Sequence, residues 1–389
     1  MVQKIPVTSL DSQRPFRNLL INGDMRVAQR GTSATTVVYD TVHTVDQWKA
    51  NYTQGATSVF SVEQSTDVPT GEGFKNSLLY KCTTAESSLN AGQRMMPLCR
   101  VEGQNCQSLD WGTSSAKSIT LSFWVKSNLT GTYQVNLWAN DASSFISDTY
   151  AISSANTWEF KTCHFAGNQG SAITDDDGPG IQAEFVLSAG SDYSSGTQIA
   201  NTTTTYPSYG ATTRAASQGV NMASSTSNNW YLTGVQLEAG GTGTNFTDPS
   251  DFEFLPHDVQ LQRCARYLRM LKMQGIHSGT YQFANNWSRV NPTYANAASE
   301  MRTVPSAAWK TATPTFDASA TVLTTDTNEF RWGYNGTEVD TTPSATLGID
   351  NIGFYSLSIY NSGINHNTNG STGFVSFKVQ PTIILNSEL

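Results

Sequence analysis

Tryptophans and amides spaced along two predicted strands are the residues of this chain whose chemistry suggests a ligand. Residues 118–127 and 132–141 alternate apolar and polar side chains, a pattern typical of strands with one buried face. Opposite the aliphatic side chains, the first strand carries Trp124 and the second carries Asn136, Trp138 and Asn140. An aromatic ring can stack on a sugar while amides hydrogen-bond its hydroxyl groups. We therefore predict a hairpin whose polar face binds a glycan.

A structural role for the same tryptophans is the alternative. Large aromatic side chains are highly buried on average, so Trp124 and Trp138 could lie in a second core layer or at a contact between subunits. Trp158 and Trp230, at the starts of later predicted strands, are expected in the core. The sequence does not decide whether Trp124 and Trp138 bind a sugar or pack within the protein.

A second candidate contact lies near the C-terminus, in the loop 360–373. This loop joins two predicted strands, is polar apart from Ile364, and carries His366 and Asn367 near its centre. Loops on a rigid β scaffold are common binding sites. We predict receptor contact at these two residues or on the neighbouring loop 332–344, with an ordinary solvated loop as the alternative.

No pattern in the sequence selects a catalytic group. A polysaccharide-cleaving enzyme would need two carboxylates about 5–9 Å apart, and the spacing of the acidic residues singles out no pair. The chain has no G-x-S-x-G, H-E-x-x-H or P-loop motif, and its five histidines are scattered. The run Asp175–Asp177 could suit Ca²⁺ but lacks the spacing of a calcium loop, so a solvated acidic turn is expected. We predict a protein without catalysis.

Composition narrows the possible partners. Only 14% of the 389 residues are charged, the formal net charge is −8, and the pI is near 5.1. This balance argues against nucleic acid, which needs a basic stripe. We find no apolar run long enough to span a membrane and no signal peptide, so we expect no membrane insertion and cytoplasmic synthesis. The five cysteines are too few and too scattered for a disulfide framework, and we expect them reduced and mostly packed.

The order of the predicted elements indicates a mainly β protein. Short strands fill the chain to about residue 245, one helix is predicted over 258–273 with Asp258 as its N-cap, and short strands follow. We divide the chain into an N-terminal attachment segment (1–17), a β-sandwich (18–245), a linker with a connector helix (246–275) and a C-terminal β tip domain (276–389).

Four motifs in order along the chain resemble those of bacteriophage tail-fibre and related virion proteins. They are "NLLINGDMRVAQRG" (18–31) with "YDTVHTVDQWKA" (39–50), then "WYLTGVQLEAGGTGTNF" (230–246), "LQRCARYLRM" (261–270) and "ASEMRTVPSA" (298–307). The strands 117–240 also resemble the jelly-roll of carbohydrate-binding modules of the galactose-binding type. This resemblance implies that Leu19–Ile21 lie beside Val235–Leu237, with Asp46 and Trp48 fixing the next segment to the core.

The resemblance implies a function and a set of partners. The chain would be a virion protein, made in the host cytoplasm, that attaches a phage to a bacterial surface glycan or receptor. It would assemble as a homotrimer and contact other virion proteins. A structural calcium ion is implied near Asp24 and Glu238, with no other cofactor. The alternatives are a structural fibre or connector of the tail or capsid, and a polysaccharide depolymerase.

Overall fold

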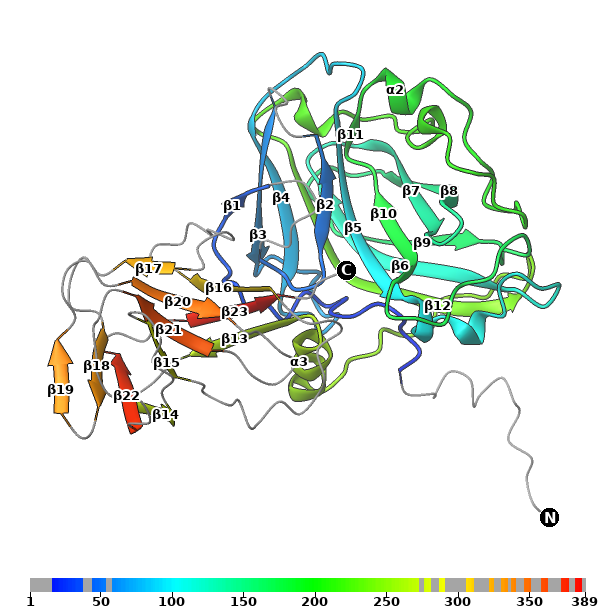
Figure 1. Ribbon diagram of the computed structural model, residues 1–389. Helices are drawn as coiled ribbons and strands as arrows, with labels where there is room; N and C mark the ends of the chain where they lie inside the picture. Colours follow the sequence, from blue (N-terminus) through cyan, green and yellow to red (C-terminus); the bar gives the residue numbers. More distant parts are fainter. Residues whose placement is uncertain are drawn as a thin grey trace. The chain divides into compact units, whose positions relative to one another are not determined.

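The chain forms two compact units, which run to Leu261 and from Gln262 to Glu388. The computed structural model (Figure 1) describes residues 16–37, 44–53 and 58–269 in full, and beyond them only the backbone of strands β13 to β23. Each unit is described by itself below. None of the helices described has the length and apolarity needed to cross a bilayer.

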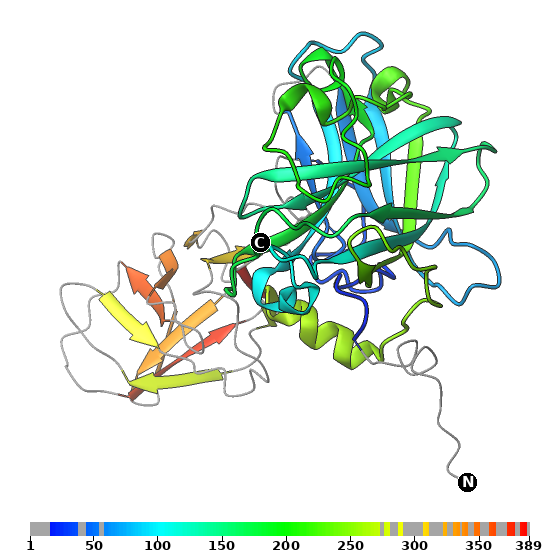
Figure 2. The same ribbon diagram turned by 90° about the vertical axis from the view of Figure 1, so that its right-hand side faces the viewer.

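The first unit is a sandwich of two antiparallel sheets, which we call sheet A and sheet B (Figures 1 and 2). Sheet A has the order β1 (Thr35–Thr36), β3 (Val59–Ser65), β4 (Ser77–Thr84), β12 (Asn229–Thr242), β6 (Lys117–Ser127) and β9 (Glu159–Phe165). Sheet B has the order β11 (Ser188–Ala189), β5 (Arg94–Glu102), β10 (Pro179–Phe185), β7 (Gly131–Ala139) and β8 (Ser144–Ile152), with β2 (Lys49–Tyr52) paired to β5. The mainly β, jelly-roll-like sandwich is as predicted.

Short helical turns lie in the connections. They are η1 (Gly103–Asn105), η2 (Gln107–Leu109), α2 (Ser191–Ser194), η3 (Ala211–Thr213) and η4 (Met222–Ser224). Three of them, α2, η3 and η4, belong to the long excursion between β11 and β12.

The predicted hairpin of residues 118–127 and 132–141 is wrong. Its first strand, β6, pairs with β12 and β9, whereas β7 pairs with β10 and β8 in the other sheet. Both strands turn their aliphatic faces to the common core. An alternation of apolar and polar residues fits two neighbouring strands of one sheet. It fits equally well two strands of different sheets that face each other across a core. As a consequence, the polar faces of β6 and β7 point away from each other.

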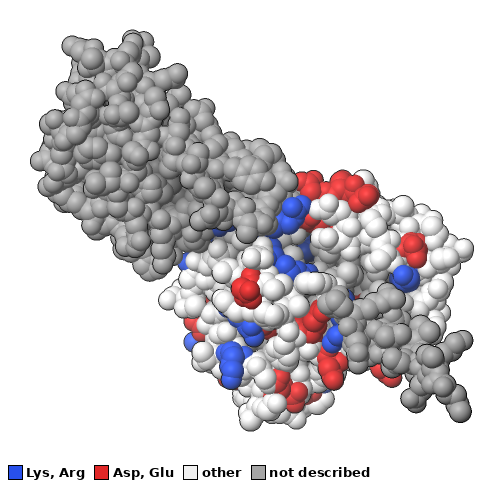
Figure 3. Space-filling model, turned by 90° about the horizontal axis from the view of Figure 1, so that it is seen from below, with Lys and Arg blue, Asp and Glu red and all other residues white. Residues whose placement is uncertain are grey.

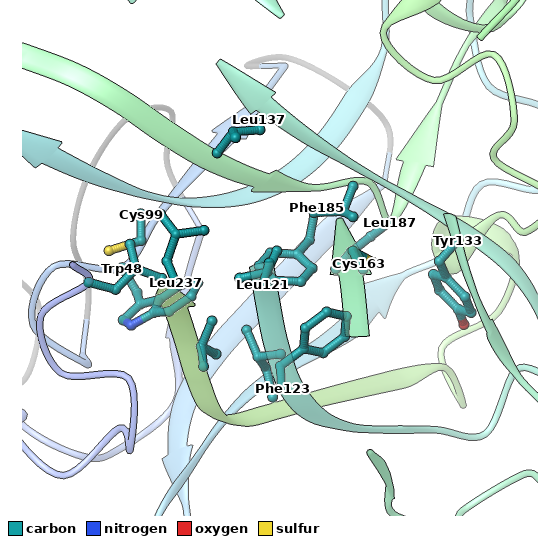
Figure 4. Close-up of a cluster of buried hydrophobic side chains, with 14 of the residues drawn as sticks. Trp48, Cys99, Leu121, Phe123, Tyr133, Leu137, Cys163, Phe185, Leu187 and Leu237 are labelled. Carbon is teal, nitrogen blue, oxygen red and sulfur yellow. The ribbon is translucent and has the colours of Figure 1, made fainter. Parts of the chain in front are cut away.

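The core between the sheets is continuous and rich in aromatic rings (Figure 4). Phe123 of β6 packs edge-on against Phe185 of β10 with ring centroids 5.1 Å apart, and both are fully buried. Burying one such side chain stabilises a fold by roughly 1.5–3 kcal/mol. All five cysteines are free and buried, as predicted.

The segment that begins "NLLINGD" closes the sandwich beside β12, as expected. The Leu19 amide donates to the Leu237 carbonyl (3.0 Å), and the Val235 amide donates to the Gly23 carbonyl (2.9 Å). The Asn18 side chain bonds the backbone of both Val235 and Leu237. The segment is irregular and not a strand, and it lies beside the part of β12 where the pairing with β6 shifts register, between Thr233 and Gln236.

Asp46 and Trp48 fix the following segment, again as expected. Both oxygens of the fully buried Asp46 accept hydrogen bonds from Gln29, one from its backbone amide (3.0 Å) and one from its side chain (2.7 Å). The indole of Trp48 donates to the Asn22 carbonyl at 3.3 Å. These contacts join the two halves of the N-terminal motif into one buried unit.

The predicted helix is half as long as expected. Helix α3 spans His257–Ala265, and the chain then enters strand β13 (Leu268–Lys272). The prediction of a helix over 258–273 is therefore wrong for its second half. Strand β13 pairs with β23 (Thr382–Asn386), and such a long-range ladder overrides the local helical pattern.

The strands that the structure describes in the second unit form three antiparallel sheets. One has the order β13, β23 and β16 (Ser306–Lys310). The next has the order β14 (Ile276–Thr280), β22 (Thr372–Phe377), β18 (Phe330–Tyr334) and β19 (Thr337–Asp340). The third has the order β15 (Trp287–Val290), β21 (Ser358–Ser362), β20 (Thr346–Asp350) and β17 (Val322–Thr324).

Candidate functional site

The outer face of sheet A is half covered by the segment that follows β12. Thr120 donates its hydroxyl to the Thr247 carbonyl (2.8 Å), and the Glu253 amide donates to the side chain of Gln236 (2.8 Å). Phe74 closes this covered half with Phe252 and Phe254, its ring centroid 5.1 Å from each of theirs. The polar groups of the sheet in this half are therefore used within the protein.

The other half of the same face carries four aromatic side chains, Trp124, Phe160, Trp158 and Tyr231, which we call the aromatic strip. Trp124 and Phe160 are cross-strand partners of β6 and β9, and their ring centroids lie 5.5 Å apart. Phe160 is 45% exposed, and the other three are half-buried. The rings of Trp158 and Tyr231 meet edge to face at 6.1 Å.

Lys126 and Asp67 fix the second pair of rings. The Lys126 ammonium lies 4.3 Å from the ring centroid of Tyr231 and 5.3 Å from that of Trp158. It also forms an ion pair with Asp67, whose other oxygen accepts a hydrogen bond from the Trp158 indole at 3.0 Å. Cation–π contacts and a carboxylate therefore hold both rings against the sheet.

The same contacts set the ionisation of Asp67 and Tyr231. Desolvation would raise the pKa of Asp67, but hydrogen bonds from Lys126 and Trp158 outweigh it and lower that pKa below its ordinary value. Desolvation, with the charges of Asp67 and Glu63, raises the pKa of the Tyr231 phenol. At neutral pH the strip therefore presents an ionised carboxylate and a neutral phenol beside its rings.

The outer face of sheet B, which carries Trp138, is filled by the excursion 190–220. Arg214 from this excursion forms a buried ion pair with Glu184 of β10, its Nε donating to Oε1 at 2.8 Å. The Arg214 guanidinium also lies 4.9 Å from the Trp138 ring centroid. Trp138 is stacked on Phe145 at 4.6 Å and is 9% exposed.

Asn136 is saturated by protein contacts. Its amide nitrogen donates to Glu184 (3.0 Å) and to the Arg214 carbonyl (2.9 Å), and its oxygen accepts from Gln134 and Ser147. The residue is fully buried. In this conformation its amide is a packing group beneath the excursion.

Asn140 lies at the end of the same face, where Tyr209 is exposed. The Tyr209 ring is 42% exposed and sits 5.5 Å from the ring centroid of Trp138. Nearby in sequence, the Asn140 side-chain nitrogen and the Ser144 hydroxyl are buried without a hydrogen-bond partner. This end of sheet B is therefore a second candidate face, with Tyr209 as its exposed ring.

The predicted glycan residues thus separate into two groups. Trp124 belongs to the aromatic strip on sheet A, whereas Asn136, Trp138 and Asn140 belong to the opposite, outward face of sheet B. His366 and Asn367 lie outside the described residues, so their contact with a receptor stays a prediction.

The residues predicted to hold calcium have basic neighbours. Asp24 pairs with Arg26 (3.1 Å) and Glu238 with Arg17 (3.3 Å), and Glu238 also accepts a hydrogen bond from Ser250. Desolvation raises the pKa of Asp24. In the part of the chain that the structure describes, no group of three or more His, Cys, Asp or Glu side chains could hold a metal ion. Calcium at Asp24 and Glu238 stays a prediction.

Most of the aromatic strip escaped the sequence analysis. Trp230 is fully buried as predicted, but Trp158 was expected in the core and is half-buried on the outer face. Phe160 is an odd number of positions from the buried Cys163 and Phe165 of β9, so it must point to the opposite face of the strand. The bounds of β9 are needed to draw that inference. The Lys126–Asp67 pair joins residues 59 positions apart and left no local signal.

No family model and no curated protein matches this chain. Among solved structures, it is similar to a CBM4 module with 12% identity over 57% of this chain and 99% of that one, at a TM-score of 0.28. It is also similar to TmCBM61 in complex with beta-1,4-galactotriose (8% identity, 49% and 88% coverage, TM-score 0.24). A CBM29-2 variant complexed with mannohexaose matches with 11% identity, 56% and 99% coverage, and a TM-score of 0.23. At these low TM-scores, the assignment of a site rests on the residues of the chain itself.

Proposed function

We propose that the first unit binds a glycan, without cleaving it, through the aromatic strip on sheet A. The observation that carries this proposal is the pairing of Trp124 with the 45%-exposed Phe160 on a rigid sheet. Partly exposed rings next to an ionised carboxylate combine a stacking surface with hydrogen-bond acceptors. Burying the apolar face of a sugar on two such rings would contribute roughly 25 cal/mol for each Å² removed from water.

The biological setting we propose is attachment of a virion to its host. Support comes from the four tail-fibre-like motifs, of which the first and third form the junction between residues 18–31 and β12. Attachment proteins of this kind gain from several weak sites acting together, since linked sites raise avidity by about 10²–10⁴. A homotrimer would supply three copies of the strip.

Substitution on the two outer faces tests the binding proposal. Trp124→Ala and Phe160→Ala should each abolish retention of the protein in gels that contain the bound polysaccharide. Tyr209→Ala, which removes an exposed ring of similar size from sheet B, is the matched control and should be retained like the parent. Loss of retention in Tyr209→Ala alone would transfer the site to the Trp138 face.

The same assay separates the alternative functions. New reducing ends in the polysaccharide after incubation would contradict binding without cleavage. Unchanged retention in all three variants would show that the glycan binds neither to the aromatic strip nor to the Trp138 face. If Trp124→Ala instead prevented assembly with other virion proteins while glycan retention persisted, the strip would be a structural contact.

A further inference from the structure

The charges around the aromatic strip discriminate between classes of sugar. Lys126 contacts two rings of the strip, Trp158 and Tyr231, and its side chain is only 10% exposed. Its ammonium already has Asp67 and the faces of Trp158 and Tyr231 as partners. Little of its charge therefore remains for the carboxylate of an acidic sugar.

Asp67, by contrast, presents open acceptor capacity. Its side chain is 46% exposed, and each of its oxygens has one donor in the protein, Lys126 for one and the Trp158 indole for the other. An ionised carboxylate offers about four acceptor positions, so about two remain for a ligand. Two adjacent sugar hydroxyls would supply that number of donors.

A second carboxylate lies on the same face. Glu63 of β3 is the cross-strand partner of Leu79, which is in turn the partner of Tyr231. The charges of Asp67 and Glu63 both act on the Tyr231 phenol. An acidic sugar at the rings would meet repulsion from this side.

Lys81, His164 and Lys161 are further titratable groups of β4 and β9. Lys81 of β4 is exposed, but it pairs in register with Asn229, one outward-facing position beyond Tyr231. On β9, His164 stacks on Phe246 at 5.1 Å, in the covered half. Lys161 follows Phe160 along β9, but its ammonium is paired with Glu159 at 2.6 Å and it lies in register with the inward-facing Phe123.

We infer that the aromatic strip takes neutral glycans whose sugars carry adjacent hydroxyl groups, and that Asp67 accepts hydrogen bonds from those hydroxyls. This inference rests on the proposed function of the strip. Uronic and sialic acids would be excluded by the two carboxylates and by the neutralised Lys126. Asp67 is thus a binding residue, and Lys126 is a positioning residue that holds it.

The test is a titration of the full chain with two sets of polysaccharides, at 20 mM and at 500 mM NaCl. Galactan, mannan and xylan represent neutral glycans, and polygalacturonate and alginate represent acidic ones. At least one neutral polymer should bind with little salt dependence, and the acidic polymers should bind at least tenfold more weakly. Asp67→Asn should weaken the neutral interaction about tenfold, because a hydrogen bond to a charged group is lost.

Asp110→Asn is the matched control. Asp110 is also exposed and paired with a lysine, Lys117 at 3.8 Å, but it lies outside the strip and should bind like the parent. Acidic polymers that bind as tightly as neutral ones, or an unchanged affinity in a folded Asp67→Asn, would overturn the inference and leave glycan binding intact. Failure of every polymer to bind would instead count against the proposed function itself.

Discussion

Gly23 is a single residue on which the packing of the N-terminal motif against β12 depends. A Cβ atom at this position would lie 2.0 Å from the carbonyl oxygen of Val235, a distance that real contacts do not reach. The same backbone carries the hydrogen bond from the Val235 amide to the Gly23 carbonyl. The N-terminal motif therefore needs a glycine because of close packing against β12.

Replacement of Gly23 by alanine should lower the free energy of unfolding by about 1–3 kcal/mol, the usual cost of overpacking. For a unit of this size, thermal denaturation should show a decrease in Tm of about 2–4 °C for each kcal/mol. Gly210→Ala is the control, since a Cβ there would meet its nearest neighbour, the Thr213 hydroxyl, only at 3.7 Å. Equal stability of the two variants would contradict the close approach.

The ionisation of Asp67 sets the expected pH dependence of binding. Its pKa is lowered below the ordinary 3.8, so the carboxylate stays charged from neutral pH down to about pH 4. Affinity for a neutral glycan should be constant over that range and decrease only at lower pH, as Asp67 is protonated. A titration midpoint near pH 6 would show that a different group controls binding.

At the scale of elements, the buried pair of Glu184 and Arg214 holds the excursion 190–220 against sheet B. Arg214 combines the ion pair with a contact to the Trp138 ring, and its backbone carbonyl accepts from Asn136 and Gln134. Burial alone would lower the pKa of Arg214, but the charge of Glu184 raises it, so the guanidinium stays charged. Removing one partner would leave a buried charge uncompensated.

Arg214→Met should therefore lower the free energy of unfolding by about 3–5 kcal/mol. Limited proteolysis should then cut first within the excursion, and the double variant Glu184→Gln/Arg214→Met should recover part of the loss. Lys117→Met breaks an exposed pair and should cost less than about 1 kcal/mol. If Arg214→Met and Lys117→Met lowered the free energy of unfolding by similar amounts, the Glu184–Arg214 pair would not be what holds the excursion in place.

Whole strands were easier to predict than their placement. The alternation in residues 118–127 gave the correct buried face of β6, because burial depends only on which side chains are apolar. It could not say that β7 belongs to the other sheet, since register and sheet membership depend on β9, β10 and β12. For the same reason Trp124 and Trp138 were joined in one site, although they lie on opposite outer faces.

Contacts between residues distant in sequence explain the other failures. The Lys126–Asp67 pair and the cover over Gln236 both arise from tertiary packing. The second half of the predicted helix became β13 because a partner strand more than a hundred residues later supplies its hydrogen bonds. Conversely, the contact of Leu19 with β12 was predicted, since it follows from a recognisable motif.

At the scale of the whole molecule, charged residues are sparse and make up only 14% of the chain. Charged side chains of the described part are scattered among uncharged ones on the face in Figure 3. A surface of this kind suits contacts to neutral, hydroxylated partners more than to a charged polymer.

The proposed assembly is open to a direct check. The mass of the full chain in solution, measured by light scattering, should be three times the 42.2 kDa of one chain. A monomer at all concentrations would contradict the trimer, while binding by a single strip could still be measured.

The central claim concerns the position of the glycan, and a crystal structure with the most tightly bound neutral oligosaccharide tests it most directly. We predict a sugar ring stacked on Trp124 and Phe160, with its hydroxyls bonded to Asp67. A sugar bound instead against Tyr209 and Trp138 would contradict the assignment of the site to sheet A.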